Sequence, residues 1–396
     1  MDTLGSDSRS SLAIFVPGSN ELTGAPRRAL TLAKLLKQHG IPTCAICRNK
    51  GAVASEARRL RLPTLVISTE KVMAARTKAP KWLWILIVLA FSPVRAAQII
   101  YRVKRSGIKV VWVRASAGLA LHGLWAWLGG AHIVWDIDYE PTPTRMMRAL
   151  HLVGLTISSL IVTQYRDAPT EIFGPTAASR YSKKMETLVP GIDTDHLSTF
   201  QTNPLKRPPT DRFIIAHVGS ITHRKGQLVT LEAAYLLLES NPSIDIHIWF
   251  LGGTHDASYL QKLRARAYDL GMERLCKFLG WQEDIYSYMA TAQVLTLPST
   301  NEGVPNAVQE AMYIGLPVVA SPVGGTSDII THMETGQLAS PTDLSAWTRC
   351  LERVAARDPK VIQCTCKAKE FAQARFPADA WAQQYATMIE THCAIK

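Results

Sequence analysis

Short apolar runs alternate with longer segments of helical periodicity along most of this chain. In the second half, runs of strand length occur at 213–220, 244–253, 276–281, 292–299 and 316–321. Between them, residues 227–240 and 304–314 repeat their apolar positions every three to four residues, which predicts helices. Strands that alternate with helices predict a parallel sheet whose faces the helices cover.

The first half shows the same alternation. Strands are predicted at 12–18, 42–48, 109–115, 132–138 and 159–164, with a helix over 27–40. A segment rich in Pro, Thr and Asn, 199–212, interrupts the pattern and predicts a linker. We therefore expect an α/β protein of two doubly wound domains facing across a cleft, 1–198 and 199–375, with a C-terminal helix at 376–396 that packs back on the first domain.

Two glutamates flank the start of the predicted helix 304–314. Glu302 lies on the loop just before this helix, and Glu310 lies two turns inside it. Carboxylates in these places can accept hydrogen bonds from hydroxyl groups on either side of the helix start. The alternative is that Glu302 only compensates the helix dipole and Glu310 is a solvated surface residue.

The helix start between these glutamates can bind an anion. Pro305 suits the first turn of a helix, and the N–H groups of Gly303, Val304 and Asn306 are available to a ligand. Such a helix end attracts phosphate groups. Phosphate donors flanked by hydroxyl acceptors are the layout that a sugar nucleotide diphosphate requires.

Size and cysteine content set further limits. With 396 residues and 47% hydrophobic content, the chain can bury two cores. Its seven cysteines are scattered, and Cys364 and Cys366 have no second pair at zinc-ligand spacing, which favours reduced structural thiols. The first ten residues are polar and hold no apolar signal segment, so we expect a cytoplasmic protein.

The net charge of +12 is concentrated in one stretch. Residues 71–135 carry ten basic side chains and no acidic one, whereas residues 199–375 carry 17 of each sign. The basic stretch includes ten consecutive apolar residues at 82–91, too few to span a bilayer, which needs about 20. Two interpretations stay open: an interfacial segment that meets anionic lipid, or a buried helix with solvated charges around it. Nucleic acid is not expected, because no binding motif accompanies the charge.

The second half resembles a known enzyme family. The stretches "LVPGIDTDHL", "HVGSITHRKGQLVTLEAA" and "FLGWQEDIYSYMATAQVLTLPSTNEGVPNAVQEAMYIGLPVVASPVGGTSDII" together are similar to the retaining glycosyltransferases of family 4, which have the GT-B fold. The two glutamates eight positions apart match the signature of that family. The resemblance is strong over 187–340, weaker over 22–40, and absent from 71–131.

The resemblance implies roles for individual residues. Lys225 would contact the diphosphate and stabilise charge on the leaving group. Glu302 would hold hydroxyls of the donor sugar, and Glu310 would accept from the ribose hydroxyls. Gly24 would let the backbone approach the diphosphate, although a plain turn glycine is the alternative, and the loop at Trp281 would contact the base. The helix start formed by Gly303, Val304, Pro305 and Asn306 would bind the donor.

Two positions depart from the family pattern. An arginine is common where this chain has Ser220, so Arg224 or the serine hydroxyl would take its place. A histidine is common where this chain has Asp138, with Asp136 and Glu140 beside it. We take Asp138 as a candidate catalytic residue, with ordinary strand-end residues as the alternative.

The resemblance further implies transfer of a hexose-type sugar with retention, without a metal ion or cofactor. The donor would be a nucleotide diphosphate sugar. We expect UDP rather than GDP, and no single residue of the sequence distinguishes the two nucleotides. The acceptor would be a saccharide, in particular a lipid-linked one of surface polysaccharide biosynthesis. We expect residues 71–114 to hold the protein peripherally at an anionic membrane, on the inner face of the cell membrane. The alternatives are a GT-B binding or regulatory subunit with weak turnover, and a transferase with a soluble acceptor.

Overall fold

In the computed structural model, the described residues are 11–17, 22, 24–67, 96–138, 145–200 and 212–394. They form two units, Met1–Gly191 with Ala378–Lys396 as unit 1 and Ile192–Pro377 as unit 2. The predicted boundaries were 1–198 and 199–375, with 376–396 returning to the first domain. Most of the predicted linker, 201–211, and the apolar run 82–91 lie outside the described residues.

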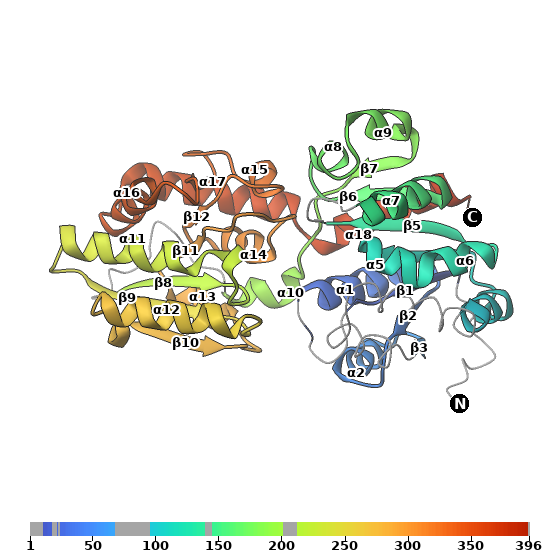
Figure 1. Ribbon diagram of the computed structural model, residues 1–396, viewed down its shortest axis with the longest axis horizontal. Coiled ribbons are helices and arrows are strands. Elements are labelled where there is room, and N and C mark those ends of the chain that lie inside the picture. The colour runs from blue at the N-terminus through green and yellow to red at the C-terminus, as the bar shows by residue number, and fades with distance from the viewer. Residues whose placement is uncertain are drawn as a thin grey trace. The chain divides into compact units, whose positions relative to one another are not determined.

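Unit 1 contains a seven-stranded parallel sheet in the order β3-β2-β1-β4-β5-β6-β7 (Figure 1). Its strands are β1 (Leu12–Phe15), β2 (Thr43–Cys47), β3 (Thr64–Val66), β4 (Val110–Arg114), β5 (His132–Ile137), β6 (Ser158–Thr163) and β7 (Met185–Thr187). Its helices are α1 (Gly24–Gln38), α2 (Ala52–Arg59), α5 (Ala115–Gly118), η1 (Leu119–Gly123), α6 (Leu124–Leu128), α7 (Arg145–Ile157), α8 (Ala168–Phe173), α9 (Pro175–Arg180), η2 (Ser182–Lys184) and α18 (Ala378–Cys393), together with a helix at 96–106.

The strand order of unit 1 separates its helices onto two faces. Helices α1, α2 and α18 pack against one face and share a single buried core with the strands. Segments α5, η1 and α6 run on without a break after β4 and lie on the other face, beside α7. Right-handed crossovers require this arrangement, because the chain winds in opposite directions from β1 and from β4. The strand order therefore reverses between β1 and β4.

Unit 2 contains a six-stranded parallel sheet in the order β10-β9-β8-β11-β12-β13. Its strands are β8 (Arg212–Val218), β9 (Asp245–Leu251), β10 (Cys276–Gly280), β11 (Val294–Leu297), β12 (Val318–Ala320) and β13 (Gln337–Leu338). Its helices are α10 (Thr194–Leu197), η3 (Ser198–Phe200), η5 (His223–Lys225), α11 (Gln227–Ser240), α12 (Ala257–Asp269), η6 (Glu273–Leu275), α13 (Tyr286–Thr291), α14 (Asn306–Ile314), α15 (Thr326–Ile329), α16 (Leu344–Ala355) and α17 (Pro359–Arg375). The strand order reverses between β8 and β11.

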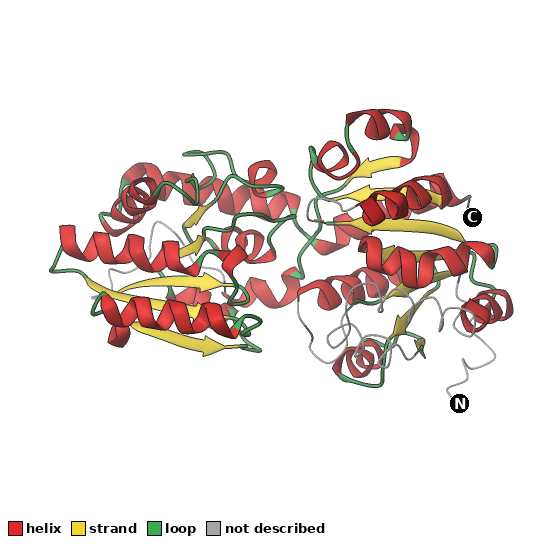
Figure 2. Ribbon diagram, viewed as in Figure 1, coloured by secondary structure: helices red, strands yellow, loops and turns green. Residues whose placement is uncertain are grey.

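The predicted α/β class with two doubly wound sheets is confirmed, and Figure 2 shows helices against the strands of each unit. The predicted strands lie within two to three residues of their observed ends. Two helix starts were wrong, since α1 begins at Gly24 rather than at Arg27, and α14 begins at Asn306 rather than at Val304. Pro305 disfavours helical geometry in the residue before it and is itself extended, with ψ 116°, so Val304 cannot join the helix.

Candidate functional site

The reversal of strand order in unit 2 brings two loops together at the carboxyl ends of β8 and β11. In doubly wound sheets, ligands bind at this point, where neighbouring loops diverge. The loop after β8 carries Arg224 and Lys225, and the loop after β11 carries Ser299 and Glu302. Four polar side chains from separate parts of the sequence thus meet at one edge of the sheet.

Glu302 is the centre of this group. Its Oε1 atom accepts from Lys225 Nζ at 2.6 Å and from Ser299 Oγ at 2.6 Å. Its Oε2 atom lies 3.2 Å from Arg224 NH1. The glutamate side chain is 8% exposed, so this carboxylate needs its partners to remain charged. Burial would raise the pKa of Glu302, but Lys225 and Arg224 hold it below its usual value.

Lys225, like its partner Glu302, is largely shielded from solvent. Its side chain is 13% exposed, and burial lowers its pKa against the opposing effect of Glu302. Gly226 follows at φ +71°, and a Cβ atom there would lie 2.2 Å from the carbonyl oxygen of Pro298. Only glycine therefore allows the β8 loop to approach the β11 loop this closely.

Arg224 ties the two loops together. Its NH1 group donates to the carbonyl oxygen of Asn301 at 2.6 Å, and its own carbonyl oxygen accepts from Thr300 N at 2.9 Å. With Lys225 and Glu302 ionised, the three side chains carry a net charge of +1. A diphosphate complements that charge, and the Lys225 ammonium retains donors beyond the one that Glu302 accepts.

A glycine loop covers the other side of Glu302. Gly324 has φ +49°, and a Cβ atom there would lie 1.8 Å from the carbonyl oxygen of Glu302. The N–H of Gly325 donates to the carbonyl oxygen of Gly303 at 2.9 Å. The loop after β12 thereby fixes the backbone that leads into α14.

The first turn of α14 closes on Pro305, whose carbonyl oxygen accepts from both Val308 N and Gln309 N. Glu310 is 8% exposed, and its Oε1 atom accepts from the hydroxyl of Tyr286 at 3.3 Å.

The other predicted donor-site residues of unit 2 are more dispersed. The carbonyl oxygen of Ser220 accepts from Gln227 Nε2 at 3.0 Å. Trp281 follows β10 and is 49% exposed. In the sheet order, β9 and β8 separate β10 from β11, so Trp281 lies two strands away from β8.

The two candidates of unit 1 are found at the carboxyl edge of its sheet. Gly24 is the first residue of α1. Asp138 follows β5, and its Oδ2 atom accepts from Arg114 NH2 at 2.6 Å. Asp136 is buried, and Glu140 lies outside the described residues.

Sequence reasoning missed several residues of these sites. Ser299 and Tyr286 each hold one of the two glutamates, and Arg114 pairs with Asp138. His217, on β8, is fully buried, and burial lowers its pKa to about 3, with a smaller effect of Lys225. Arg114 could have been singled out from the sequence only by its position at the end of a strand next to which the strand order reverses.

Two kinds of feature are absent from the described residues. Among the described residues, no group of three or more His, Cys, Asp or Glu side chains is placed to hold a metal ion. None of the helices in the described ranges is both long and apolar enough to cross a bilayer.

Comparison with known proteins gives a family for part of the chain. Residues 212–357 match the family described as "Glycosyl transferases group 1". The chain is 25% identical to a D-inositol 3-phosphate glycosyltransferase of Corynebacterium aurimucosum, over 90% of this chain and 88% of that protein. It is 28% identical to an Escherichia coli UDP-Gal:alpha-D-GlcNAc-diphosphoundecaprenol alpha-1,3-galactosyltransferase, over 46% of this chain and 45% of that enzyme. Several such matches span about half the length of the relative or less.

Solved structures show the same fold. The crystal structure of Anabaena HepE in complex with UDP and glucose superposes with a TM-score of 0.76, 18% sequence identity, and coverage of 96% of this chain and 100% of that one. The structures that match are GT-B glycosyltransferases, so the chain has the GT-B fold. The residues that match the group 1 glycosyltransferase family, 212–357, include Lys225, Glu302 and Glu310.

Proposed function

We propose that the protein is a retaining glycosyltransferase that moves a hexose from a nucleotide diphosphate sugar, UDP-linked, to a hydroxyl of a lipid-linked saccharide. The observation that carries this is the buried ion pair of Lys225 and Glu302 at the strand reversal of unit 2, reinforced by Arg224. This arrangement places cations that can bind a diphosphate next to a carboxylate that can accept hydrogen bonds from sugar hydroxyls.

The chemistry follows from these charges. The sugar C1–O bond breaks through an oxocarbenium-like state, and the negative charge that develops on the diphosphate is stabilised by Lys225 and by the start of α14. The acceptor hydroxyl attacks from the same face, and the leaving phosphate oxygen takes its proton. This scheme uses neither a carboxylate nucleophile nor a metal ion. Glu310 is assigned to the ribose and Trp281, with its loop, to the base.

The names of related proteins support the donor and the acceptor. One relative is named for transfer from UDP-galactose to a diphosphoundecaprenol-linked sugar, and another for an inositol phosphate. One structure of the same fold contains UDP and glucose. We assign the donor to unit 2, which holds the Lys225–Glu302 pair, and the acceptor to unit 1.

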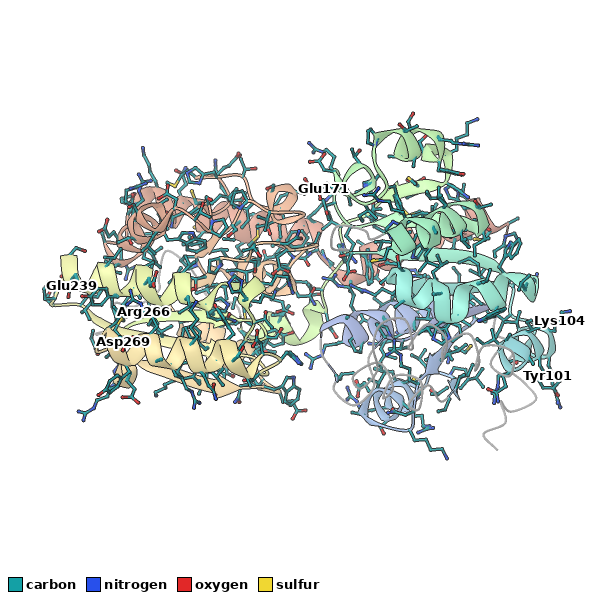
Figure 3. The ribbon with its side chains drawn as sticks, viewed as in Figure 1. Tyr101, Lys104, Glu171, Glu239, Arg266 and Asp269 are labelled. Atoms are coloured by element: carbon teal, nitrogen blue, oxygen red, sulfur yellow. The ribbon has the colours of Figure 1, made fainter. Side chains whose placement is uncertain are left out.

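We also propose that unit 1 docks on an anionic membrane from the cytoplasmic side. The described part of the basic stretch supports this, since helix 96–106 exposes Tyr101 and Lys104 at the periphery of unit 1 (Figure 3). Arg105 donates to the Tyr101 hydroxyl and lies over its ring, 5.6 Å from the centroid. The end of α6 lies beside this helix and exposes 44% of Trp127. Helix 96–106 and α6 hold no acidic residue, which suits contact with anionic headgroups.

The test begins with donor binding. Thermal unfolding is followed with UDP, GDP and a panel of their sugars, because a ligand that binds the folded state raises the melting temperature. The sugar nucleotide that gives the largest shift is then supplied with a polyprenyl-diphosphate saccharide, and the anomeric configuration of the product is read by NMR. We expect a UDP-sugar to stabilise the protein and the product to retain configuration.

Each possible failure has its own meaning. Inverted configuration would refute retention. Binding without transfer to lipid-linked or soluble acceptors would indicate a binding or regulatory subunit. No shift with any nucleotide diphosphate would overturn the proposal.

A further inference from the structure

A buried chain of polar side chains joins the C-terminal helix α18 to the end of strand β5. The Tyr385 hydroxyl donates to Asp136 Oδ2 at 2.9 Å and accepts from Trp112 Nε1 at 2.9 Å. Tyr385 is fully buried, and Trp112 is 1% exposed. Among the described residues of α18, only Tyr385 takes part in this chain of bonds. Its hydroxyl acts as both a donor and an acceptor.

Asp136 is a buried carboxylate with a defined set of partners. It is 4% exposed, and its Oδ1 atom accepts from Gln164 Nε2 at 3.4 Å. Gln164 in turn accepts from Arg28 NH1 at 3.4 Å. Burial raises the pKa of Asp136, while Arg114 and Tyr385 act against that rise.

Arg114 connects this buried carboxylate to the edge of the sheet. Arg114 and Asp136 are register partners on the neighbouring strands β4 and β5, and Asp138 follows two positions later on the same face. The Arg114 side chain is 9% exposed and donates to Asp138 Oδ2 at 2.6 Å. Arg114 thus pairs with Asp138, whose side chain is 34% exposed, while its charge also acts on the neighbouring buried carboxylate of Asp136.

The location of the pair bears on function. β4 lies next to β1, where the strand order of unit 1 reverses, so Arg114 and Asp138 stand at the edge where doubly wound sheets bind ligands. An exposed carboxylate with its charge fixed by a buried guanidinium is suited to accept a hydrogen bond from a saccharide hydroxyl.

We propose that Tyr385 is a positioning residue for glycosyl transfer, which holds Asp136 and through it the Arg114–Asp138 pair at the ligand edge of unit 1. The inference rests on the proposed function, because it gives Asp138 a hydroxyl of the reacting saccharides as its ligand. Without the tyrosine hydroxyl, Asp136 Oδ2 and Trp112 Nε1 lose a buried partner. Asp136 then draws more strongly on Arg114, and the guanidinium shifts away from Asp138.

The test replaces Tyr385 with phenylalanine, which keeps the ring and removes the hydroxyl. Misplacing a reacting group by about 1 Å can cost on the order of 10²-fold, so we expect kcat to fall 10- to 100-fold. UDP affinity by calorimetry should stay unchanged, because the nucleotide belongs to unit 2. The acid limb of the pH profile should move to higher pH, because a hydrogen bond that favours the charged form of Asp136 is lost.

Trp381→Phe is the matched control. Trp381 lies one turn before Tyr385, and their rings pack edge to face with centroids 5.9 Å apart. Its indole N–H has no hydrogen-bond partner among the described residues. The substitution loosens α18 without touching Asp136, so we expect a lower melting temperature with unchanged kcat and pH profile.

A second measurement is independent of activity. Hydrogen exchange followed by mass spectrometry should show faster exchange over 112–118 and 134–138 in Tyr385→Phe and not in Trp381→Phe. If Tyr385→Phe fails to fold, Asp136→Asn removes the charge that competes for Arg114 and should still change kcat and the acid limb. Wild-type protein without transferase activity would refute the proposed function, and the exchange experiment would still test the coupling. Equal changes in the two α18 variants, in kinetics and in exchange, would overturn the inference.

Discussion

Lys225 and Glu302 are 77 positions apart in the sequence, yet their Nζ and Oε1 atoms lie 2.6 Å apart. They come from the loops that follow β8 and β11, the two strands between which the order of the sheet reverses. Glu302 is buried, and the side chain of Lys225 is 13% exposed. A buried pair of this kind is costly to break from one side, because the remaining charge has no water to solvate it.

Lys225→Ala should reduce turnover by about 10²-fold, the scale seen when one preorganised charge stabiliser is removed. Arg224 and Ser299 remain as partners of Glu302, so the folded state should persist. Single-turnover kinetics at saturating donor measure the effect, with Arg224→Ala as the comparison. If Lys225→Ala kept near-normal turnover while Arg224→Ala lost it, the roles of the two cations would be exchanged.

Glu310→Ala should weaken donor binding by about 1–3 kcal/mol, the cost of removing an acceptor from buried hydroxyl groups. Calorimetry with UDP measures it. The control is Tyr286→Phe, which removes the hydroxyl that donates to Glu310 Oε1 at 3.3 Å and leaves the carboxylate in place. Unchanged UDP affinity in Glu310→Ala would remove the ribose assignment.

Gly324→Ala should displace the Glu302 loop and lower both stability and turnover, since the new Cβ atom would lie 1.8 Å from the Glu302 carbonyl oxygen. Gly271→Ala is the matched control. Gly271 has φ +68°, and nothing lies within 4 Å of its Cβ position, so that variant carries only backbone strain. That strain costs about 1–2 kcal/mol. Thermal unfolding and turnover of the two variants should differ, and equal losses would mean that the close approach to Glu302 has no effect.

His217 should make unit 2 less stable in mild acid. Its folded-state pKa is lowered from 6.5 to about 3, chiefly by burial, so the unfolded chain binds more protons between these values. Stability is therefore full above pH 6.5 and falls by about 1.4 kcal/mol per pH unit below it, until the pH reaches the folded-state pKa. Calorimetric unfolding of His217→Gln should show a shallower dependence over this range. A dependence identical to wild type would contradict the burial of a neutral imidazole.

Membrane docking should depend on anionic lipid and on unit 1. The protein should sediment with phosphatidylglycerol vesicles, release as salt rises, and bind neutral vesicles weakly, because salt screens its basic side chains. Two paired changes should weaken binding: Tyr101→Ser with Trp127→Ser, and Trp82→Ser with Trp84→Ser. Lys78→Glu with Lys81→Glu should do the same. The control is Tyr268→Ser, a 71% exposed tyrosine of unit 2. Equal, negligible binding to both kinds of vesicle would favour a soluble acceptor.

The sequence by itself determined the class of fold and the elements that carry the donor site. Buried parallel strands read as mostly apolar runs, so β8, β9, β11 and β12 were predictable from the local sequence. Glycine and proline marked the ends of α14, and only its first two residues were placed wrongly. These are local properties, set by side-chain size, backbone freedom and periodicity.

The tertiary structure decided which of the polar residues meet. Lys225 reaches Glu302 from the β8 loop and Tyr286 reaches Glu310 from α13, and local periodicity says nothing about contacts 77 or 24 positions apart. In unit 1 the sequence singled out Asp138 as the candidate and placed Asp136 two positions before it on the same strand end. The folded structure distinguishes the two acids. Tyr385 on α18, 249 positions further along the chain, donates a hydrogen bond to Asp136 in the interior, whereas Arg114 pairs with Asp138 at the edge of the sheet. Burial and pairing, which fix the charge of such groups, depend on packing between distant segments, and only the folded chain brings those segments together.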